Sequence, residues 1–240
     1  MRAVGQFLFD LSGRVAVIIG GTSGIGRALA VGLEQHGARV VAAGRSSAEH
    51  PVDVTSRKSI ENLRDQVGAV DILINAAGQT FRQPTAEITE LAWTQLIDVT
   101  LTGMLRASQV FYESLKASGR GRVVNIASLS SYVAFQEVAA YCAAKTGVLS
   151  LTRSLAVEWA KDGICVNAIA PGVFPTELNS RLIEGTARGS ELLMRTPMRR
   201  FGRPEELVGA AVLLSSDAAS FLTGQCITVD GGFLASGANH

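Results

Sequence analysis

Tyr141 and Lys145 lie four residues apart in the stretch AYCAAK, with only small residues between them. Four residues is just over one turn of an α-helix, so both side chains would project from the same helical face. An ammonium beside a phenol favours the phenolate, which makes the phenol a candidate general acid or base. The same spacing also fits a surface helix with a half-buried tyrosine and a solvated lysine, so other motifs have to decide.

A glycine-rich turn lies much earlier in the chain, in the stretch GGTSGIG from Gly20 to Gly26. Gly20, Gly24 and Gly26 form the pattern G-x-x-x-G-x-G, which is related to the dinucleotide-binding fingerprint but has one more residue in the turn. Glycines let the backbone approach a pyrophosphate closely, and the N-terminus of a following helix favours its negative charge. The turn therefore indicates a dinucleotide site, although glycine-rich turns also occur for packing reasons.

Short apolar runs rich in β-branched residues alternate with longer stretches of helical periodicity. Thr55 could cap one of the predicted helices. Repeated strand–helix–strand units predict a parallel sheet covered on both faces, with ligands bound beyond the carboxyl ends of the strands. The predicted strands span 14–20, 38–44, 70–78, 121–128, 164–172 and 225–232, and the predicted helices span 27–37, 55–68, 90–117, 139–163 and 204–216.

The bulk composition fits a single domain over residues 1–240, because 47% of the residues are hydrophobic and no linker or repeat interrupts the chain. Lys and Arg number 22 against 21 Asp and Glu, with no basic tract, which argues against nucleic acid and anionic membranes as partners. No apolar run approaches the length that spans a bilayer. Widely spaced cysteines and scattered histidines predict a cytoplasmic protein with reduced thiols and no metal site.

The end of the second predicted strand bears on the choice between NAD and NADP. An acidic residue there would hold the 2′-hydroxyl of NAD, but this chain has Gly44 and Arg45, followed by Ser46. A guanidinium can pair with the 2′-phosphate of NADP, so Arg45 favours NADP, and NAD stays possible. The alternative is a solvated arginine at a strand end.

Taken in order, the motifs resemble those of the short-chain dehydrogenase/reductase family over nearly the whole chain. They are GGTSGIG, DVT at 53–55, NAAG at 75–78, NIAS ending at Ser128, YCAAK, and APGVFPT at 170–176. The resemblance implies a Rossmann-type, doubly wound parallel sheet of seven strands with helices on both faces. It also implies an NAD(P)-dependent oxidoreductase that acts on a small carbonyl or alcohol as a homotetramer.

The same resemblance assigns roles to individual residues. Tyr141 is the acid or base, Ser128 orients the reacting carbonyl, and Lys145 together with the positive nicotinamide lowers the pKa of the tyrosine. Residues 53–54 would lie at the adenine, 75–78 beside the ribose and 171–176 along the nicotinamide. The expected cofactor-binding residues are Gly20, Thr22, Ser23, Gly24, Ile25, Gly26, Arg45, Asp53, Val54, Asn75, Ala77, Gly78, Tyr141, Lys145, Pro171, Gly172, Phe174 and Thr176.

Thr100 is the main departure from the family pattern, which has asparagine at this position as a fourth catalytic residue. A threonine hydroxyl can still donate and accept, so the resemblance implies an altered proton relay through Thr100. The hydroxyl could also bond back to a carbonyl one turn earlier and bend the helix. Ile19 and Ala76 also depart from the pattern, and the segment between the second strand and Asp53 is so short that the usual helix there is expected to be missing.

The substrate is indicated by fewer residues. The run 195–221 is similar to the gluconate 5-dehydrogenase and deoxygluconate dehydrogenase branch, which implies a sugar, polyol or aldonate. Residues 177–200 are expected to form a helical lid. Two alternatives remain: a 3-oxoacyl thioester or general carbonyl reductase, and a cofactor-binding regulatory protein with little turnover. The arginines that could meet an acidic or hydroxylated substrate, or be solvated charges, are Arg82, Arg181, Arg188, Arg195, Arg199 and Arg200.

Overall fold

A computed structural model of the chain describes residues 8–177, 179–183 and 185–237. Among these residues, six strands form one parallel sheet in the order β2-β1-β3-β4-β5-β6. The predicted strands and their parallel arrangement are therefore confirmed. The strands are β1 (Val15–Ile19), β2 (Arg39–Ala43), β3 (Ile72–Asn75), β4 (Arg122–Ile126), β5 (Cys165–Pro171) and β6 (Cys226–Val229).

The expectation of a seventh strand was wrong for the described part of the chain. After β2, the chain makes a single parallel bridge between Gly44 and Pro51 instead of a strand. A parallel strand needs a crossover of roughly a dozen residues or more, and only residues 45–50 lie between the two bridge partners. The backbone N–H of Gly44 donates to the carbonyl of His50 (3.3 Å), and the N–H of Val52 donates to the carbonyl of Gly44 (3.2 Å), which closes this loop. The sequence predicted that the usual helix would be missing here, and the structure has a tight turn in its place.

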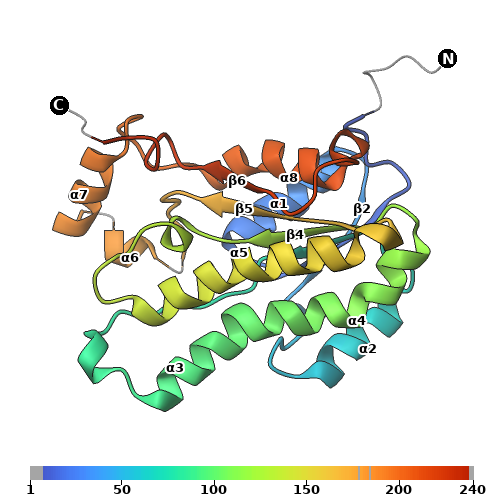
Figure 1. Cartoon of the computed structure of the whole chain (residues 1–240), viewed down its shortest axis with the longest axis horizontal. Coiled ribbons are helices and arrows are strands. Elements are labelled where there is room, and N and C mark those ends of the chain that lie inside the picture. Colours follow the sequence, from blue (N-terminus) through green and yellow to red (C-terminus); the bar gives the residue numbers. More distant parts are fainter. Residues whose placement is uncertain (1–7, 178, 184, 238–240) are drawn as a thin grey trace.

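Helices cover both faces of the sheet (Figure 1). One face carries α1 (Gly24–Gln35) and α8 (Val208–Ser215), with Leu29 and Leu33 of α1 in its core. The other face carries α2 (Arg57–Val67), α4 (Gly103–Ala117) and α5 (Ala139–Trp159), with Phe111 and Trp159 in its core. Each face thus has its own apolar core, as expected for strands that are apolar on both sides.

A π-helical segment (Asp98–Thr102) joins α3 (Glu90–Ile97) to α4. The sequence predicted one helix over 90–117. In the structure, a wider π-helical turn interrupts this helix around Thr100. Single π-helical turns inside α-helices are frequent at functional sites. α5 lies close to this segment because of a glycine, since a Cβ atom on Gly147 would come within 2.7 Å of the side chain of Leu101.

The predicted cap of α2 was wrong by one residue. Ser56 caps this helix, because its hydroxyl accepts a hydrogen bond from the backbone N–H of Ser59 at 3.3 Å. The hydroxyl of Thr55 instead donates to the carboxylate of Asp53 at 2.7 Å. Serine and threonine are both good capping residues. Ser56 caps the helix because the hydroxyl of Thr55 is bound to the carboxylate of Asp53.

Several short helices complete the described chain. Between β5 and α8 lie α6 (Ser180–Ile183) and α7 (Ala187–Arg195). None of the described helices is both long and apolar enough to cross a membrane. Single 3₁₀ turns span Thr85–Glu87, Leu129–Ser131, Ala160–Asp162, Pro204–Leu207 and Asp217–Ala219.

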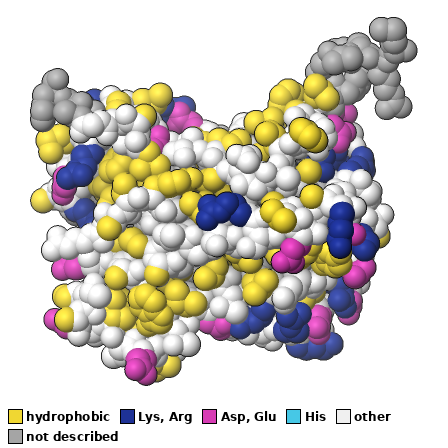
Figure 2. All heavy atoms as spheres, in the orientation of Figure 1, with side chains coloured by type: hydrophobic (Ala, Val, Ile, Leu, Met, Phe, Trp, Pro, Cys, Tyr) yellow, Lys and Arg dark blue, Asp and Glu magenta, His cyan; other side chains and the backbone are white. Residues whose placement is uncertain are grey.

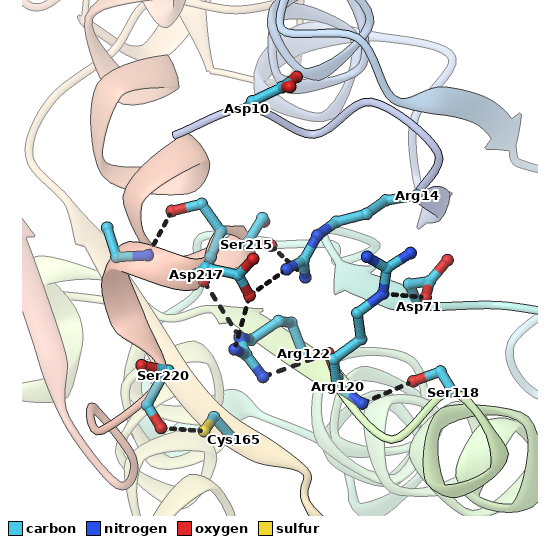
Figure 3. A network of polar contacts seen from close by, with 12 residues as sticks. Asp10, Arg14, Asp71, Ser118, Arg120, Arg122, Cys165, Ser215, Asp217 and Ser220 are labelled. Carbon is cyan, nitrogen blue, oxygen red and sulfur yellow. Dashed lines mark hydrogen bonds and ion pairs between the residues drawn. The ribbon is translucent and has the colours of Figure 1, made fainter. Parts of the chain in front are cut away.

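Two buried arginines tie the amino ends of the central strands to the segment after α8 (Figure 3). Arg14 precedes β1, forms an ion pair with Asp217 and donates to the backbone carbonyl of Ser215 at 3.1 Å. Arg122 begins β4 and donates to the backbone carbonyl of Ser216 at 3.3 Å. Carbonyl groups and a shared carboxylate therefore compensate both buried charges. This network stabilises the end of the sheet opposite the carboxyl ends of the strands.

Candidate active site

A cavity of about 940 Å³ lies at the carboxyl ends of the strands, where open α/β sheets bind ligands. It brings together residues that follow β1, β2, β3, β4 and β5. Its volume is at the upper end of the range for ligand pockets and suits a long cofactor. The predicted residues that line it are Gly20, Thr22, Ser23, Gly24, Ile25, Gly26, Arg45, Asp53, Val54, Ala77, Gly78, Ser128, Tyr141, Lys145, Pro171, Gly172, Phe174 and Thr176.

The glycine turn fits the pyrophosphate of a dinucleotide. Gly20 has a φ of 88°, and a Cβ atom there would lie 2.6 Å from the backbone nitrogen of Ala77. A Cβ atom on Gly26 would collide with the carbonyl of Gly20. Ser23, at the N-cap of α1, makes no side-chain capping bond, so the first N–H groups of the helix stay available to an anion. Only glycines fit this close turn, and its free donors suit a phosphate.

Polar groups gather at the end of β2. Asp53 accepts hydrogen bonds from the backbone N–H (2.9 Å) and hydroxyl (2.7 Å) of Thr55. These bonds hold the pKa of Asp53 below its ordinary value, with a smaller contribution from the charge of Arg45. The hydroxyls of Thr22 and Ser46 lie 3.3 Å apart beside the same cavity. A guanidinium and two hydroxyls at this place suit a phosphate group.

Ser128, Tyr141 and Lys145 meet at one wall of the cavity. Ser128 follows β4, and Tyr141 and Lys145 project from the first turns of α5. The phenol of Tyr141 is hydrogen-bonded to the hydroxyl of Ser128. The ammonium of Lys145 lies 5.6 Å from the centre of the tyrosine ring and donates to the backbone carbonyl of Ile126 at 2.6 Å. The spacing of Tyr141 and Lys145 therefore places both on one helical face directed into the cavity, not toward solvent.

With a bound cofactor, the pKa of Tyr141 was expected to be lowered. In the chain alone, it is raised. Burial raises the pKa of Tyr141, and the hydrogen bond with Ser128 opposes this shift. Burial lowers the pKa of Lys145 to about 7, because the side chain is only 4% exposed. An ammonium that is already losing its proton near neutral pH stabilises a phenolate weakly. Tyr141 is therefore protonated at neutral pH, which is the form that donates a proton.

Thr100 lies beside the site but does not line the cavity. It is fully buried in the π-helical segment, and its hydroxyl lies 3.4 Å from both the N–H and the carbonyl oxygen of Gln79. The hydroxyl thus bonds across to the loop after β3, not back to its own helix as the sequence had suggested. Its methyl group lies near Gly78, where a Cβ atom would be 3.9 Å from Thr100 and 3.8 Å from the ammonium of Lys145.

Asn75 is the other predicted residue that does not line the cavity. Its side chain is buried and donates to the hydroxyl of Ser108 at 3.2 Å and to the side-chain oxygen of Asn125 at 2.9 Å. Asn125 in turn donates to Thr152 at 3.0 Å. Asn75 therefore links β3 to α4 and β4 inside the protein, and the residues after it form the cavity wall.

The turn after β5 forms the opposite wall. Asn179 fixes this turn, because its side chain accepts from the N–H of Thr176 at 2.8 Å and donates to the carbonyl of Phe174 at 3.0 Å. The methyl group of Thr176 faces Gly24 of the glycine turn. No motif in the sequence pointed to Asn179. Its side chain closes the turn by bonding to backbone groups three and five residues earlier in the chain.

The part of the cavity beside the loop 135–138 is lined by residues that no sequence motif predicted. Phe81, Phe135, Val138, Ile183 and Leu192 lie there, on two loops and on α6 and α7. Only the folded chain brings these segments together. Among the described residues, no group of three or more His, Cys, Asp or Glu side chains is placed to hold a metal ion.

Two of the six arginines considered from the sequence, Arg82 and Arg188, line this part of the cavity. The side chain of Arg181 lies outside the described part of the chain. The other three lie elsewhere: Arg195 and Arg200 form ion pairs with Glu191 and Glu206, and Arg199 donates to the carbonyl of Met194.

Comparison with known proteins gives matches over nearly the whole chain. Residues 20–234 match a family model described as Enoyl-(Acyl carrier protein) reductase. The chain is 37% identical to gluconate 5-dehydrogenase of Gluconobacter oxydans (strain 621H), over 95% of this chain and 98% of that protein. It is 35% identical to the NAD-dependent glycerol dehydrogenase of Listeria innocua serovar 6a, over 94% of this chain and 95% of that protein.

A solved structure shows the same architecture. The gluconate 5-dehydrogenase from Burkholderia cenocepacia J2315, in complex with NADP and tartrate, matches with a TM-score of 0.91 at 36% identity. The match covers 96% of this chain and 98% of that one. These similarities, the ordered motifs and the convergence of Ser128, Tyr141 and Lys145 on one cavity show that the chain belongs to the short-chain dehydrogenase/reductase family.

Proposed function

We propose that this chain is an oxidoreductase that moves a hydride between a nicotinamide cofactor and a secondary alcohol or ketone of a sugar acid or polyol. The observation that carries the proposal is the meeting of Ser128, Tyr141 and Lys145 beside the glycine turn in one cavity. The names of the gluconate and glycerol dehydrogenases, and the tartrate of the Burkholderia complex, support a small hydroxylated substrate.

Each part of the cavity has a proposed partner in the cofactor. The glycine turn holds the pyrophosphate, Arg45, Asp53 and Val54 hold the adenosine half, and residues 171–176 lie along the nicotinamide. Ala77 and Gly78 lie beside the ribose. The cofactor, when bound, supplies or accepts the hydride. The close approach of Gly20 and Gly26 to backbone atoms supports this arrangement, because a side chain at either position would fill the space.

The proposed chemistry of the chain's own residues is a proton transfer. In the direction of reduction, the hydroxyl of Ser128 orients the ketone and the phenol of Tyr141 gives its proton to the developing alkoxide. The bond between Tyr141 and Ser128 and the protonated state of the phenol support these roles. Lys145 holds the cofactor ribose and restores the proton of Tyr141.

A spectrophotometric screen tests the function. Purified protein is mixed with NADPH or NADH and with sugar acids, ketoses, diketones or acyl thioesters, and loss of the reduced cofactor is followed. We expect oxidation with sugar acids or ketoses. Activity only on acetoacetyl thioesters would select a 3-oxoacyl thioester reductase. Tight NADPH binding without oxidation across the panel would select the regulatory alternative.

We propose that NADP(H) is preferred and that NAD(H) is possible. Arg45, Thr22 and Ser46 supply one positive charge and two hydroxyls where a 2′-phosphate would lie, and no carboxylate ends β2. The NADP in the Burkholderia complex supports this preference, whereas the relative from Listeria is named as NAD-dependent. The charge at the end of β2 is therefore the feature to test.

Arg45→Ala should reduce kcat/KM with NADPH by about 10- to 100-fold and leave kcat/KM with NADH nearly unchanged. The reason is the loss of a charge-assisted contact worth about 1–3 kcal/mol that only the phosphate can make. Steady-state kinetics with both cofactors measures this. Arg39→Ala is a matched control, because Arg39 is exposed at the other end of β2 and does not line the cavity. Equal losses with both cofactors would show that Arg45 does not read the phosphate.

Thr100→Val should slow turnover by about 5- to 30-fold, while Thr100→Asn should keep or raise it. Valine leaves the buried N–H and carbonyl of Gln79 without their partner, which costs about 1–2 kcal/mol and loosens the loop beside Lys145. Turnover and unfolding midpoints are measured together, so that a folding defect is recognised. Full activity of Thr100→Val would exclude a relay role. An inert parent that Thr100→Asn activates would instead support the regulatory alternative.

We propose that the described chain acts as one catalytic domain with a helical lid at 177–200. Ile183 of α6 and Leu192 of α7 line the cavity, which supports a covering role for this segment. Two short helices joined by loops can move as a unit more easily than the central sheet. Protection of this segment from proteolysis by bound cofactor and substrate would be the expected sign of closure.

We propose a homotetramer. Figure 2 shows several patches of hydrophobic side chains on the face that carries α4 and α5. Val157 of α5 is 81% exposed and Leu91 of α3 is 68% exposed. β6 also forms an edge of the sheet and pairs only with β5 among the described strands. Exposed apolar side chains and a free strand edge are typical of subunit contacts. Light scattering at micromolar concentration should give four times the mass of the chain.

We also propose a cytoplasmic location. Cys142, Cys165 and Cys226 are all unpaired, and a reducing compartment keeps thiols in that state. Fractionation of the source cells, with the protein detected by antibody, tests this location.

A further inference from the structure

We infer that Arg188 of α7 binds the carboxylate of an acidic substrate and so makes the enzyme prefer aldonates to uncharged polyols. This inference rests on the proposed function, and it names the group that chooses between the two substrate classes. Two charged side chains, Arg82 and Arg188, line the cavity beside the loop that contains Gln136 and Glu137. The environment of each decides which of them is available to a ligand.

Arg188 differs from the other described arginines of this region, because it pairs with no carboxylate that the structure describes. Arg82 forms an ion pair with Glu137, and Arg195, on the same helix as Arg188, forms one with Glu191. Among the described residues, no carboxylate lies within ion-pair distance of Arg188, and its guanidinium donates only to the backbone carbonyl of Gln136, at 3.2 Å. A guanidinium has five donors, so most of them stay free for a ligand.

The loop before α5 contacts Arg188. The carbonyl of Gln136 belongs to the loop that leads into α5 and thus into Tyr141. The next residue, Glu137, has a φ of 66°, which is unusual for a residue other than glycine. Its carbonyl accepts from the N–H of Gln83 at 2.8 Å, and its carboxylate pairs with Arg82. The hydrogen bond to Gln136 therefore places the guanidinium of Arg188 beside the loop that leads into the first turn of α5.

The surroundings of Arg188 strengthen its attraction for an anion. Phe135, Val138, Ile183 and Leu192 line the same part of the cavity. A substrate that fills this space displaces water, and a charge pair is worth more where water is excluded. Two acidic residues line the cavity, Asp53 at the end of β2 and Glu177 after β5, and neither forms an ion pair with Arg188. Arg188 therefore lines the same cavity as Ser128 and Tyr141 and has no carboxylate partner among the described residues.

The geometry fits a substrate that carries its charge away from the reacting carbon. Tyr141 and Ser128 line the cavity from α5 and from the turn after β4, and Arg188 lines it from α7, a separate element. In an aldonate, a chain of hydroxylated carbons separates the carboxylate from the far secondary alcohol. A guanidinium recognises a carboxylate through two parallel hydrogen bonds, which also sets the direction of the chain.

D-gluconate and D-glucitol form a matched pair of probes, because they differ only in the carboxylate that replaces one hydroxymethyl group. We expect the parent protein to oxidise gluconate with a lower KM than glucitol. Arg188→Gln should raise the KM for gluconate by about 10- to 100-fold with little change in kcat, since a charge-assisted contact is lost. The kinetics with glucitol should hardly change. Arg188→Lys should fall between the two, because lysine keeps the charge but not the paired donors.

Arg195→Gln is the control variant, since Arg195 lies on the same helix, is 63% exposed and does not line the cavity. It should leave both substrates unaffected. A loss by Arg188→Gln that is equal for gluconate and glucitol would overturn the inference, because it would indicate a structural role of the arginine. An unchanged KM for gluconate would overturn it as well.

A binding measurement separates failure of this inference from failure of the proposed function. Calorimetric titration of gluconate and of glucitol into the protein saturated with NADP⁺ needs no turnover. If the parent oxidises neither probe, the proposed function fails, but the inference still requires that gluconate binds and that Arg188→Gln weakens its affinity by at least about tenfold. Absence of gluconate binding to the parent, or equal affinity in parent and variant, overturns the inference.

Discussion

Tyr141→Phe should lower kcat by about 10²- to 10⁴-fold and leave cofactor affinity nearly unchanged. The substitution removes only the phenolic hydroxyl, which in the structure bonds to Ser128 and is protonated at neutral pH because burial raises its pKa. Without that hydroxyl, the developing alkoxide has no positioned proton donor, and water has to serve instead. The measurement is single-turnover oxidation of bound NADPH by the best ketone of the screen, with cofactor affinity taken from fluorescence titration.

The matched control for this variant is Tyr112→Phe. Tyr112 of α4 also loses a hydroxyl, but that hydroxyl donates to Asp162 at 2.8 Å and lies outside the cavity. It should change stability without changing kcat. Comparable activity of Tyr141→Phe and the parent would sink the assignment of Tyr141 as the acid.

Lys145→Met should lower both turnover and cofactor affinity, because one buried side chain serves both. Methionine has a similar length but cannot donate, so the bond to the carbonyl of Ile126 and the contact proposed for the ribose are both lost. We expect a fall in kcat/KM of about 10²- to 10⁴-fold, with a weaker affinity for NADPH. Unchanged cofactor affinity would exclude the contact with the ribose.

The same variant should change how stability depends on pH. Burial holds the pKa of Lys145 at about 7 in the folded chain, against an ordinary value of 10.5. Between these two values the unfolded chain binds more protons than the folded chain, so the free energy of unfolding rises with pH. The contribution of Lys145 to that free energy should therefore increase by about 1.4 kcal/mol per pH unit between pH 7.5 and 9.

Denaturant unfolding of the cofactor-free protein at pH 7.5, 8.25 and 9 measures this slope. The difference between parent and Lys145→Met removes the contribution of all other titrating groups. Lys116→Met is the control, because Lys116 is 47% exposed and pairs with Asp162 at 3.0 Å. Parallel stability curves for the parent and Lys145→Met would show that the buried lysine keeps an ordinary pKa in the folded chain.

The sequence by itself determined those features that depend on residues close together in the chain. The glycine turn could be found because only glycine fits where Gly20 and Gly26 touch backbone atoms. Tyr141 and Lys145 could be paired because their spacing matches the helical turn, and the strands could be found from their runs of buried apolar residues. The shortened connection after β2 was also visible, since the number of residues is a property of the sequence alone.

Other features depended on contacts between segments far apart in the chain. The predicted seventh strand is not formed among the described residues, because the six-residue connection after β2 allows only a bridge from Gly44 to Pro51. Asn75 lies in the motif NAAG, but its side chain bonds to Ser108 of α4 and Asn125 of β4 and does not line the cavity. Thr100 bonds to Gln79 because the loop after β3 passes within reach of its hydroxyl.

Charge is where the tertiary structure decided most. From the sequence, six arginines were equal candidates for an acidic substrate, and only the fold places Arg188 at the cavity and pairs Arg195 with Glu191 on the surface. The surrounding protein desolvates both groups, which raises the pKa of Tyr141 and lowers that of Lys145. Burial and pairing are properties of the surroundings that the whole fold assembles, so no local pattern of residues encodes them.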